Sequence, residues 1–167
     1  MSPNTVPERL AALRAAMAAN GVAVYLIPVG DPHASEYLPD HYTSLTWFSG
    51  FHGENSTFVV TRTESALWAD GRYFVQAEKE IAGTEIKLQR MGEPGVPTVE
   101  EYCAAALSEG EVLGLCGLTA VTALVGKLEK ALAKKGASIK TLNLEDELWT
   151  EGRPARPATP AWILPKE

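Results

Sequence analysis

An uninterrupted apolar run at residues 22–27 is the feature that most limits how this chain can fold. A strand with one solvated face alternates apolar and polar side chains, whereas every side chain from Val22 to Ile27 is apolar. Such a run is expected for a central strand that is covered on both faces, and Pro28 ends it. The sequence therefore predicts an α/β domain.

Helix and strand patterns alternate along the rest of the chain. Helices are predicted from a cap at Asn4 or Thr5 to Gly21, and over residues 73–81, 98–107 and 121–135. Strands are predicted over residues 57–61, 65–69, 85–89, 111–116 and 138–142. Because residues 62–64 have the length of a hairpin turn, the strands that flank them are expected to be antiparallel.

The chain changes from a strand pattern to a helix pattern at Asp70 and Gly71. Residues 65–69 favour a strand, the Asp-Gly pair favours a tight turn, and the apolar side chains within 73–81 recur at helical spacing. Asp70 and Arg72 are therefore expected at the end of a strand. Open α/β sheets commonly place ligand-binding groups at that position.

The polar segment at residues 30–37 follows the central strand directly. His33 and Glu36 in this segment are candidates for acid–base chemistry or for binding a ligand. A structural interpretation is favoured, in which Asp31 and Ser35 cap a short helix that Glu36 helps to stabilise.

Residues 46–56 combine aromatic side chains with glycines and lead into the strand at 57–61. A glycine-rich loop that cradles phosphate follows a strand, opens a helix and carries further glycines or a Lys. This segment leads into a strand and contains no Lys, so a nucleotide site is not expected. Trp47, Phe48 and Phe51 are instead interpreted as packing under a tight turn.

Composition narrows the class of protein. The 167 residues suit one domain, or one domain with a tail, and the net charge of −6 without a basic block disfavours nucleic acid and anionic membranes as partners. Cys103 and Cys116 form neither a disulfide framework nor a Cys-x-x-Cys pair, which favours a reducing compartment. No apolar run approaches the ~18 residues of a membrane span, and no signal pattern opens the chain, so a cytoplasmic location is expected.

The inventory of reactive side chains contains no complete catalytic apparatus. His33, His41 and His52 lack the spacing of a familiar metal site. There is no Gly-x-Ser-x-Gly elbow, no supported Cys-His arrangement and no carboxylate pair at a diagnostic spacing. We therefore expect no catalytic residue and no metal ligand in this chain.

The composition changes from Gly152 onward, where prolines recur too often for a helix or a central strand. Residues 1–150 are thus expected to form the domain, and residues 151–167 a proline-rich linker toward a further domain. A disordered tail is nearly as well supported by composition.

Five segments, taken together and in order, carry a resemblance that none carries alone. They are residues 30–37, 48–53, 68–77 and 91–102, and Leu148-Trp149 before Arg153-Pro154. Residues 68–77 read Trp-Ala-Asp-Gly-Arg-Tyr-Phe-Val-Gln-Ala. The set resembles the N-terminal domain of Xaa-Pro aminopeptidase (aminopeptidase P) of the three-domain type, in the creatinase/prolidase group, over nearly the whole chain.

The resemblance implies an α/β single domain with a mixed β-sheet flanked by helices, in a ribonuclease-H-like arrangement. It also implies a second similar domain and a catalytic domain of pita-bread shape, which holds two manganese ions and removes the first residue of peptides whose second residue is proline. None of the manganese ligands lies in this chain, so the chain alone is expected to be inactive and to hold no cofactor. The implied partners are its downstream domains, the peptide substrate and a second copy in a full-length homodimer.

The same resemblance assigns substrate contact to Arg72, the arginine of the Asp-Gly-Arg-Tyr-Phe motif. A guanidinium suits this role because its fixed fork of donors matches a carboxylate or a peptide carbonyl. The alternative is a structural pair with Asp70 or Glu36, and the ligand role is favoured. Glu36 and His33 follow as secondary substrate-binding candidates that would orient Arg72.

The chain departs from the family pattern at two places, and its sequence is also compatible with one alternative function. Cys116 stands where the family commonly has an Asp, and residues 52–55 replace a smaller Ser- and Gly-rich turn, which leaves the role of that turn open. The alternative is a free-standing ligand-binding or interaction module without peptidase activity. Arg72, Glu36 and the proline-rich exit favour the peptidase domain.

Overall fold

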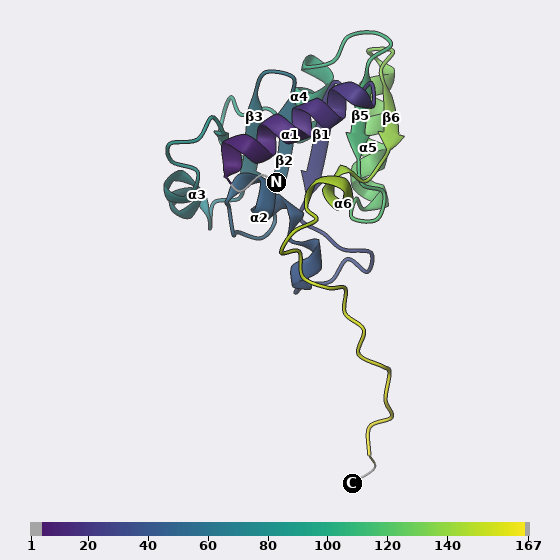
Figure 1. Ribbon diagram of the computed structural model, residues 1–167. Helices are drawn as coiled ribbons and strands as arrows, with labels where there is room; N and C mark the ends of the chain where they lie inside the picture. Colours follow the sequence, from purple (N-terminus) through teal and green to yellow (C-terminus); the bar gives the residue numbers. More distant parts are fainter. Residues whose placement is uncertain (1–4, 166–167) are drawn as a thin grey trace.

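A mixed sheet runs through the middle of the molecule, with helices on both of its faces (Figure 1). The computed structural model describes residues 5–165. The strands are β1 Val24–Pro28, β2 Thr57–Thr61, β3 Ser65–Ala69, β4 Lys87–Arg90, β5 Val112–Leu115 and β6 Ser138–Thr141. The helices are α1 Val6–Ala19, η1 Asp40–Tyr42, α2 Ser44–Ser49, α3 Phe74–Glu80, α4 Val99–Ala105, α5 Thr122–Ala133 and α6 Leu144–Leu148.

The six strands follow the order β4-β3-β2-β1-β5-β6. β2 is antiparallel to β1 and β3, and the other neighbouring pairs are parallel. This confirms the predicted hairpin and the mixed sheet. It also means that β1, β3, β4, β5 and β6 end at one edge of the sheet, which we call the carboxyl edge, and that β2 begins there.

β1 is the central strand that the apolar run predicts. All five of its residues are buried, and successive side chains alternate between the two faces of the sheet. Tyr25 and Ile27 belong to the core beneath α1, whereas Val24 and Leu26 belong to the core on the opposite face. A solvated face is therefore absent from this strand.

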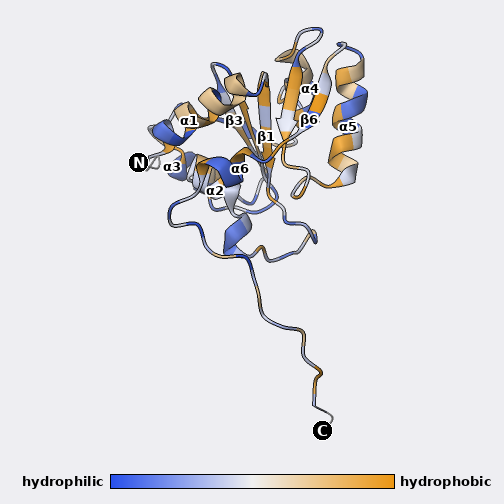
Figure 2. Ribbon diagram, turned by 45° about the vertical axis from the view of Figure 1, so that its right-hand side comes forward, coloured by the Kyte–Doolittle hydropathy of each residue, from blue (hydrophilic) through white to orange (hydrophobic). Residues whose placement is uncertain are grey.

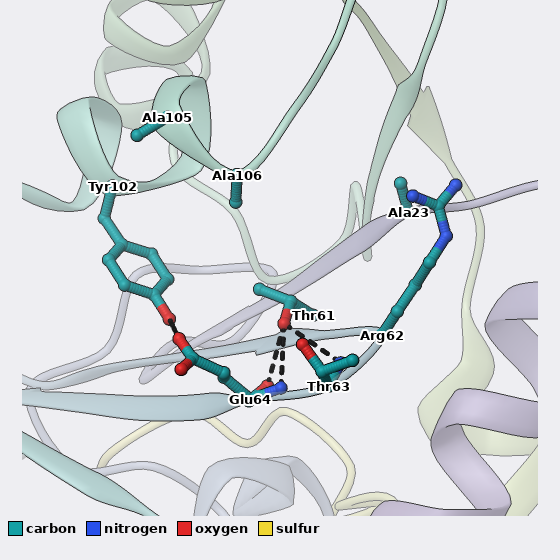
Figure 3. Close-up of a pocket in the computed structure, with 8 residues that line it drawn as sticks. All are labelled: Ala23, Thr61, Arg62, Thr63, Glu64, Tyr102, Ala105 and Ala106. Carbon is teal, nitrogen blue, oxygen red and sulfur yellow. Dashed lines mark hydrogen bonds between the residues drawn. The ribbon is translucent and has the colours of Figure 1, made fainter.

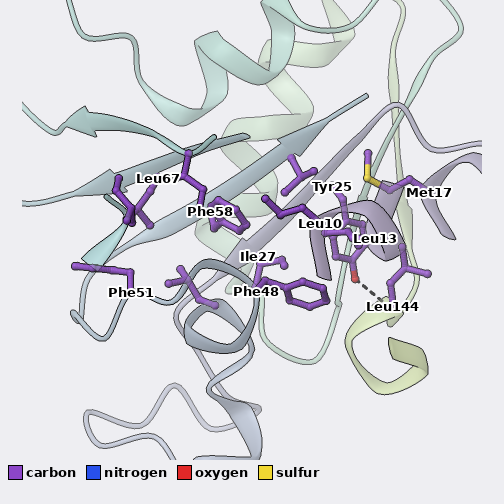
Figure 4. Close-up of a cluster of buried hydrophobic side chains, with 14 of the residues drawn as sticks. Leu10, Leu13, Met17, Tyr25, Ile27, Phe48, Phe51, Phe58, Leu67 and Leu144 are labelled. Carbon is purple, nitrogen blue, oxygen red and sulfur yellow. Dashed lines mark hydrogen bonds between the residues drawn. The ribbon is translucent and has the colours of Figure 1, made fainter. Parts of the chain in front are cut away.

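Each face of the sheet has its own core. α1, α2, α3 and α6 supply side chains to the first, which Figure 4 shows around Phe48, Phe58 and Leu67. α4 and α5 supply side chains to the second, including Cys103, Leu128 and Leu132. Figure 2 shows apolar colouring on the strands of the sheet and on α5, and polar colouring mainly in the loops and on parts of the outer helices. Burying a large apolar side chain contributes about 1.5–3 kcal/mol, so these cores hold the helices in place.

Capping boxes begin the two helices for which the sequence predicts a cap. The Thr5 hydroxyl accepts from the Glu8 backbone N–H, and the Glu8 carboxylate accepts from the Thr5 N–H at 3.0 Å. Thr98 and Glu101 form the same arrangement at α4. The alternative cap, Asn4, lies outside the described residues.

The structure differs from the sequence prediction at residues 30–37 and contains three helices that were not predicted, η1, α2 and α6. Residues 30–37 form no helix; instead the Asp31 carboxylate accepts from the backbone N–H groups of His33 and Ser35, at 2.9 and 3.0 Å. The predicted short helix is therefore wrong, because a side chain that caps a helix equally closes an isolated turn. α2 was not predicted, although Phe48 and Phe51 are fully buried beneath the turn that follows it, as expected.

The tyrosine of β1 ties the sheet to α6. The Tyr25 hydroxyl donates to the buried carboxylate of Glu145. It also accepts from the Leu144 backbone N–H at 3.2 Å, and Figure 4 draws this bond. Glu145 is 1% exposed, and this burial raises its pKa to about 7. Tyr25 has room because β5 carries Gly114 beside it, where an added Cβ would lie 2.8 Å from the Tyr25 ring.

Aromatic stacking fixes the end of the last helix. The rings of Trp47 and Trp149 stack at 5.6 Å, with Arg9 over Trp47 and Arg153 over Trp149. Arg153 also pairs with Asp146 in α6. The start of the proline-rich segment is therefore held against the domain.

His41 in η1 makes a second attachment to this segment. Its Nδ1 lies 2.7 Å from the Pro154 carbonyl oxygen, and its Nε2 lies 3.2 Å from Nε of Arg156. Residues 157–165 are exposed, contain no helix or strand, and extend away from the domain (Figure 1). Within residues 5–165, no helix has both the length and the apolar character needed to cross a bilayer.

Replacing Gly114 by Ala should destabilise the fold. The added methyl group would press on Tyr25 and Leu142, and overpacking of this kind costs about 1–3 kcal/mol. Urea unfolding of Gly114→Ala measures the loss. The matched control is Gly126→Ala within α5, where nothing lies within 4 Å of the added Cβ and a gain of about 0.5–1 kcal/mol is expected. Equal effects at both positions would contradict the steric explanation.

Glu145 should make the domain less stable as the pH rises through the neutral range. Its folded pKa of about 7 exceeds the ordinary 4.5, so between these values the folded state keeps a proton that the unfolded state has lost. The free energy of unfolding must therefore fall across this window, by about 3 kcal/mol. Unfolding of Glu145→Gln at pH 5 and pH 8 should show a smaller fall than the parent. Glu147→Gln, at an exposed position of the same helix, should leave the parent's pH dependence unchanged.

Candidate functional site

The turn after β3 brings Asp70 and Arg72 together at the carboxyl edge. The Arg72 backbone N–H donates to Oδ1 of Asp70 at 2.9 Å, which closes the predicted turn. The Arg72 side chain folds back on the same carboxylate, with Nε 3.1 Å from Oδ1 and Nη2 2.7 Å from Oδ2. The pair with Asp70 that the sequence analysis kept as an alternative is therefore present.

Tyr73, at the start of α3, packs against the guanidinium of Arg72. The guanidinium carbon of Arg72 lies 5.2 Å from the centre of the Tyr73 ring, within the range of a cation–π contact. The Tyr73 ring in turn meets the buried Phe51 edge-on. Ala77 in the next turn of α3 is fully buried in the first core, so the helix position follows from packing.

The loop before β2 contributes two further side chains. Asn55 donates from Nδ2 to Oδ2 of Asp70 at 2.9 Å, and the Tyr73 hydroxyl donates to Oε2 of Glu54 at 3.3 Å. Sequence reasoning missed both residues. The predicted hairpin could have indicated both residues. Because Thr57 pairs with Trp68, the loop before β2 must lie beside the turn after β3.

Electrostatics keeps both members of the pair ionised. The fork of Arg72, with a smaller contribution from Asn55, holds the pKa of the Asp70 carboxyl well below its usual range. Asp70 in turn raises the pKa of Arg72. The Arg72 side chain remains 66% exposed, and its Nη1 makes no hydrogen bond within residues 5–165. The Arg72 guanidinium is therefore a positive group at the carboxyl edge that is exposed to solvent and has one nitrogen available to donate a hydrogen bond.

The other predicted site residues are not joined to Arg72. Among the described residues, no hydrogen bond or ion pair links Arg72 to His33 or Glu36. His33 is exposed on the turn that Asp31 closes. Glu36 lines a cavity of about 110 Å³ together with His52, Gly53 and Glu54. Glu36 thus shares a cavity with the loop that carries Glu54 but does not contact Arg72. Its role as a substrate contact stays a prediction.

A cavity of about 440 Å³ lies at the opposite end of the sheet, around the hairpin turn. Figure 3 shows the Tyr102 hydroxyl directed at Glu64, with Arg62 extending away from both. Glu64 is paired with Lys87 and Arg62 with Glu111, so the charges at this end balance one another. Within the described part of the chain, no group of His, Cys, Asp and Glu side chains could hold a metal ion.

Comparison with known proteins assigns the family. Residues 9–148 match the family described as the Creatinase/Prolidase N-terminal domain. The chain belongs to this family. It is 39% identical to aminopeptidase P2 of Arabidopsis thaliana over 92% of this chain, and 40% identical to a probable Xaa-Pro aminopeptidase P of Sordaria macrospora over 98%.

Solved structures agree with this membership. The X-prolyl aminopeptidase from Caenorhabditis elegans, described as a cytosolic enzyme with a di-nuclear active site, is 35% identical and has a TM-score of 0.82 over 90% of this chain. The N-terminal domain of the cytoplasmic peptidase PepQ from Mycobacterium tuberculosis shares the fold, with a TM-score of 0.60 over 97% of that chain.

This creatinase/prolidase-type domain is a fraction of its relatives. It spans 22% of the Arabidopsis protein, 27% of the Sordaria protein and 26% of the C. elegans chain. The matching relatives are Xaa-Pro aminopeptidases, and the matched part corresponds to their N-terminal domain. The expectation from the five sequence segments is confirmed.

Removing the Arg72 guanidinium should raise the pKa of the Asp70 carboxyl. In Arg72→Ala the pKa of Asp70 should rise toward its ordinary value of 3.8, because the main group that stabilises the carboxylate is gone. Carboxyl-carbon NMR titration of the 167-residue chain measures this. Arg62→Ala is the control, since that side chain is similarly exposed but pairs with Glu111. An unchanged Asp70 titration in Arg72→Ala would refute the pairing.

Proposed function

We propose that this chain is the N-terminal, non-catalytic domain of a metal-dependent Xaa-Pro aminopeptidase, an enzyme that removes the residue preceding a proline from the start of a peptide. The observation that carries the proposal is the exposed, ion-paired Arg72 at the carboxyl edge of a domain from this family. The relatives it resembles carry names of this activity and are several times longer.

Arg72 is the proposed contact with the peptide. Two of its nitrogens are held by Asp70, which fixes the direction of the guanidinium, while Nη1 is available to donate to a peptide carbonyl or carboxylate. Such a contact orients the substrate and needs no proton transfer from this chain. Glu36 and His33 are proposed as secondary contacts that act from the neighbouring loop.

The hydrolytic chemistry is proposed to reside in a downstream catalytic domain. Two manganese ions there would activate the attacking water and polarise the scissile carbonyl. The described residues of this chain offer no donor cluster for such ions, so the domain by itself should not hydrolyse peptides. The Caenorhabditis neighbour, described as having a di-nuclear active site, supports a two-metal centre in the longer protein.

The remaining proposals concern organisation. Residues 151–167 are proposed to lead from this domain into a second one, with the contacts of Arg153 and Arg156 setting the direction of the exit. The full-length protein is proposed to be a cytoplasmic homodimer. The cytosolic description of the Caenorhabditis neighbour supports the location.

Arg72→Ala in the full-length peptidase should lower kcat/KM for an Xaa-Pro peptide about 10- to 100-fold. The estimate follows from the loss of one charge-assisted hydrogen bond, at about 1.5–3 kcal/mol. Arg72→Lys should recover only part of the activity, because a point charge cannot reproduce the fork. Arg62→Ala, an equally exposed arginine at the other end of the sheet, should match the parent. Parental kinetics for Arg72→Ala would remove Arg72 from the site.

A further inference from the structure

We propose that Asn55 is a positioning residue, which sets the direction of Arg72 by holding Asp70. The inference rests on the proposed function, in that it explains how the peptide-contacting arginine is aimed. It concerns a loop residue for which sequence reasoning predicted no role.

Among residues 5–165, Asn55 is the one partner of the Asp70 carboxylate from outside its own turn. Its bonds from the backbone and side chain of Arg72 come from two residues along the chain, within the same turn. These bonds join the two residues to each other, but they do not connect the Asp70 carboxylate to another part of the chain. The bond from Nδ2 of Asn55 comes from fifteen residues away, on the loop that precedes β2. It is therefore the hydrogen bond that ties the Asp70 carboxylate to a segment outside its own turn.

The loop that carries Asn55 is itself firmly held. Ser56 is buried, and its hydroxyl donates within the loop toward the carbonyl oxygens of Gly53 and Glu54, at 3.1 and 2.9 Å. Gly53 admits no side chain, because an added Cβ would lie 2.1 Å from the buried Phe51 ring. A loop can fix the position of the Asp70 carboxylate only if the loop itself does not move with Asp70. The contact of Gly53 with the buried Phe51 ring anchors this loop to the core.

The backbone at Asn55 restricts which residue can do this. Its φ is +47°, in the left-handed region that Gly, Asn and Asp tolerate best. Gly has no side-chain donor, and Asp would place a second carboxylate against Asp70. Among these three residue types, Asn alone combines the required backbone conformation with a donor for Asp70.

Glu54 supplies a second arm from the same loop. Its carboxylate accepts from the hydroxyl of Tyr73, whose ring lies under the guanidinium of Arg72. The loop thus holds Arg72 through the carboxylate that it pairs with and through the ring that it rests on. A displacement of this loop would move both supports together.

The decisive experiment uses Asn55→Gly in the 167-residue chain. Glycine keeps the backbone conformation and removes only the donor. NMR relaxation of the Arg72 Nε–H should show faster internal motion, and the pKa of Asp70 should rise because one stabilising hydrogen bond is lost. The Nε–H of Arg62, in the same sample, is the internal control and should not change. An Arg72 signal as rigid as in the parent would overturn the inference.

Kinetics of the full-length peptidase give the second readout. Asn55→Gly should lower kcat/KM about 3- to 10-fold in the parent and have no further effect in an Arg72→Ala background, because both changes act through the same guanidinium. Additive losses in the double variant would overturn the positioning role. If Arg72→Ala alone leaves the kinetics unchanged, the proposed function fails, while the relaxation experiment still decides whether Asn55 holds the arginine.

Discussion

Burial of β1 on both faces is the constraint on which the rest of the structure depends. A strand without a solvated face requires a layer of helices on each side, and the chain supplies α1, α2, α3 and α6 to one face and α4 and α5 to the other. The tyrosine in this strand places a polar group within the first core, and the Glu145 carboxylate and the Leu144 N–H satisfy it. Tyr25 thus holds the start of α6, while the Trp47–Trp149 stack and the contacts of His41 hold its end and the exit that follows.

The same topology explains where the candidate site lies. Strands that run in the same direction end at a common edge, so the segments after β1 and β3 both leave the sheet there, and the antiparallel β2 brings the loop that precedes it to the same edge. The structure converts residues that are far apart in sequence into one polar surface around Arg72. Its members are an ion pair, an amide and a carboxylate, which is the kind of group that the proposed contact with a peptide requires.

The loop at residues 52–55 changes the interpretation of the site. This loop is larger than the corresponding turn of the family that the sequence resembles, and its residues alone do not indicate a role. The structure places Asn55 and Glu54 in contact with the two residues that support Arg72. The arginine of a short, recognisable motif is therefore held by a loop that precedes the motif and is not part of it.

The sequence alone determined the elements whose signal is local. The apolar run gave the central strand, the Thr-x-x-Glu pattern gave the start of α4, and the hairpin length gave the antiparallel pair, because each depends on side chains close together in the chain. The five ordered segments similarly indicated the family. Tertiary structure decided the rest. The Asp31 carboxylate could equally have opened a helix, whereas in the structure it closes a turn in which Ala34 has the left-handed φ of +52°. The hairpin brings the loop before β2 beside the turn after β3, but only the folded loop, in which Asn55 has a φ of +47°, directs the Asn55 amide at Asp70.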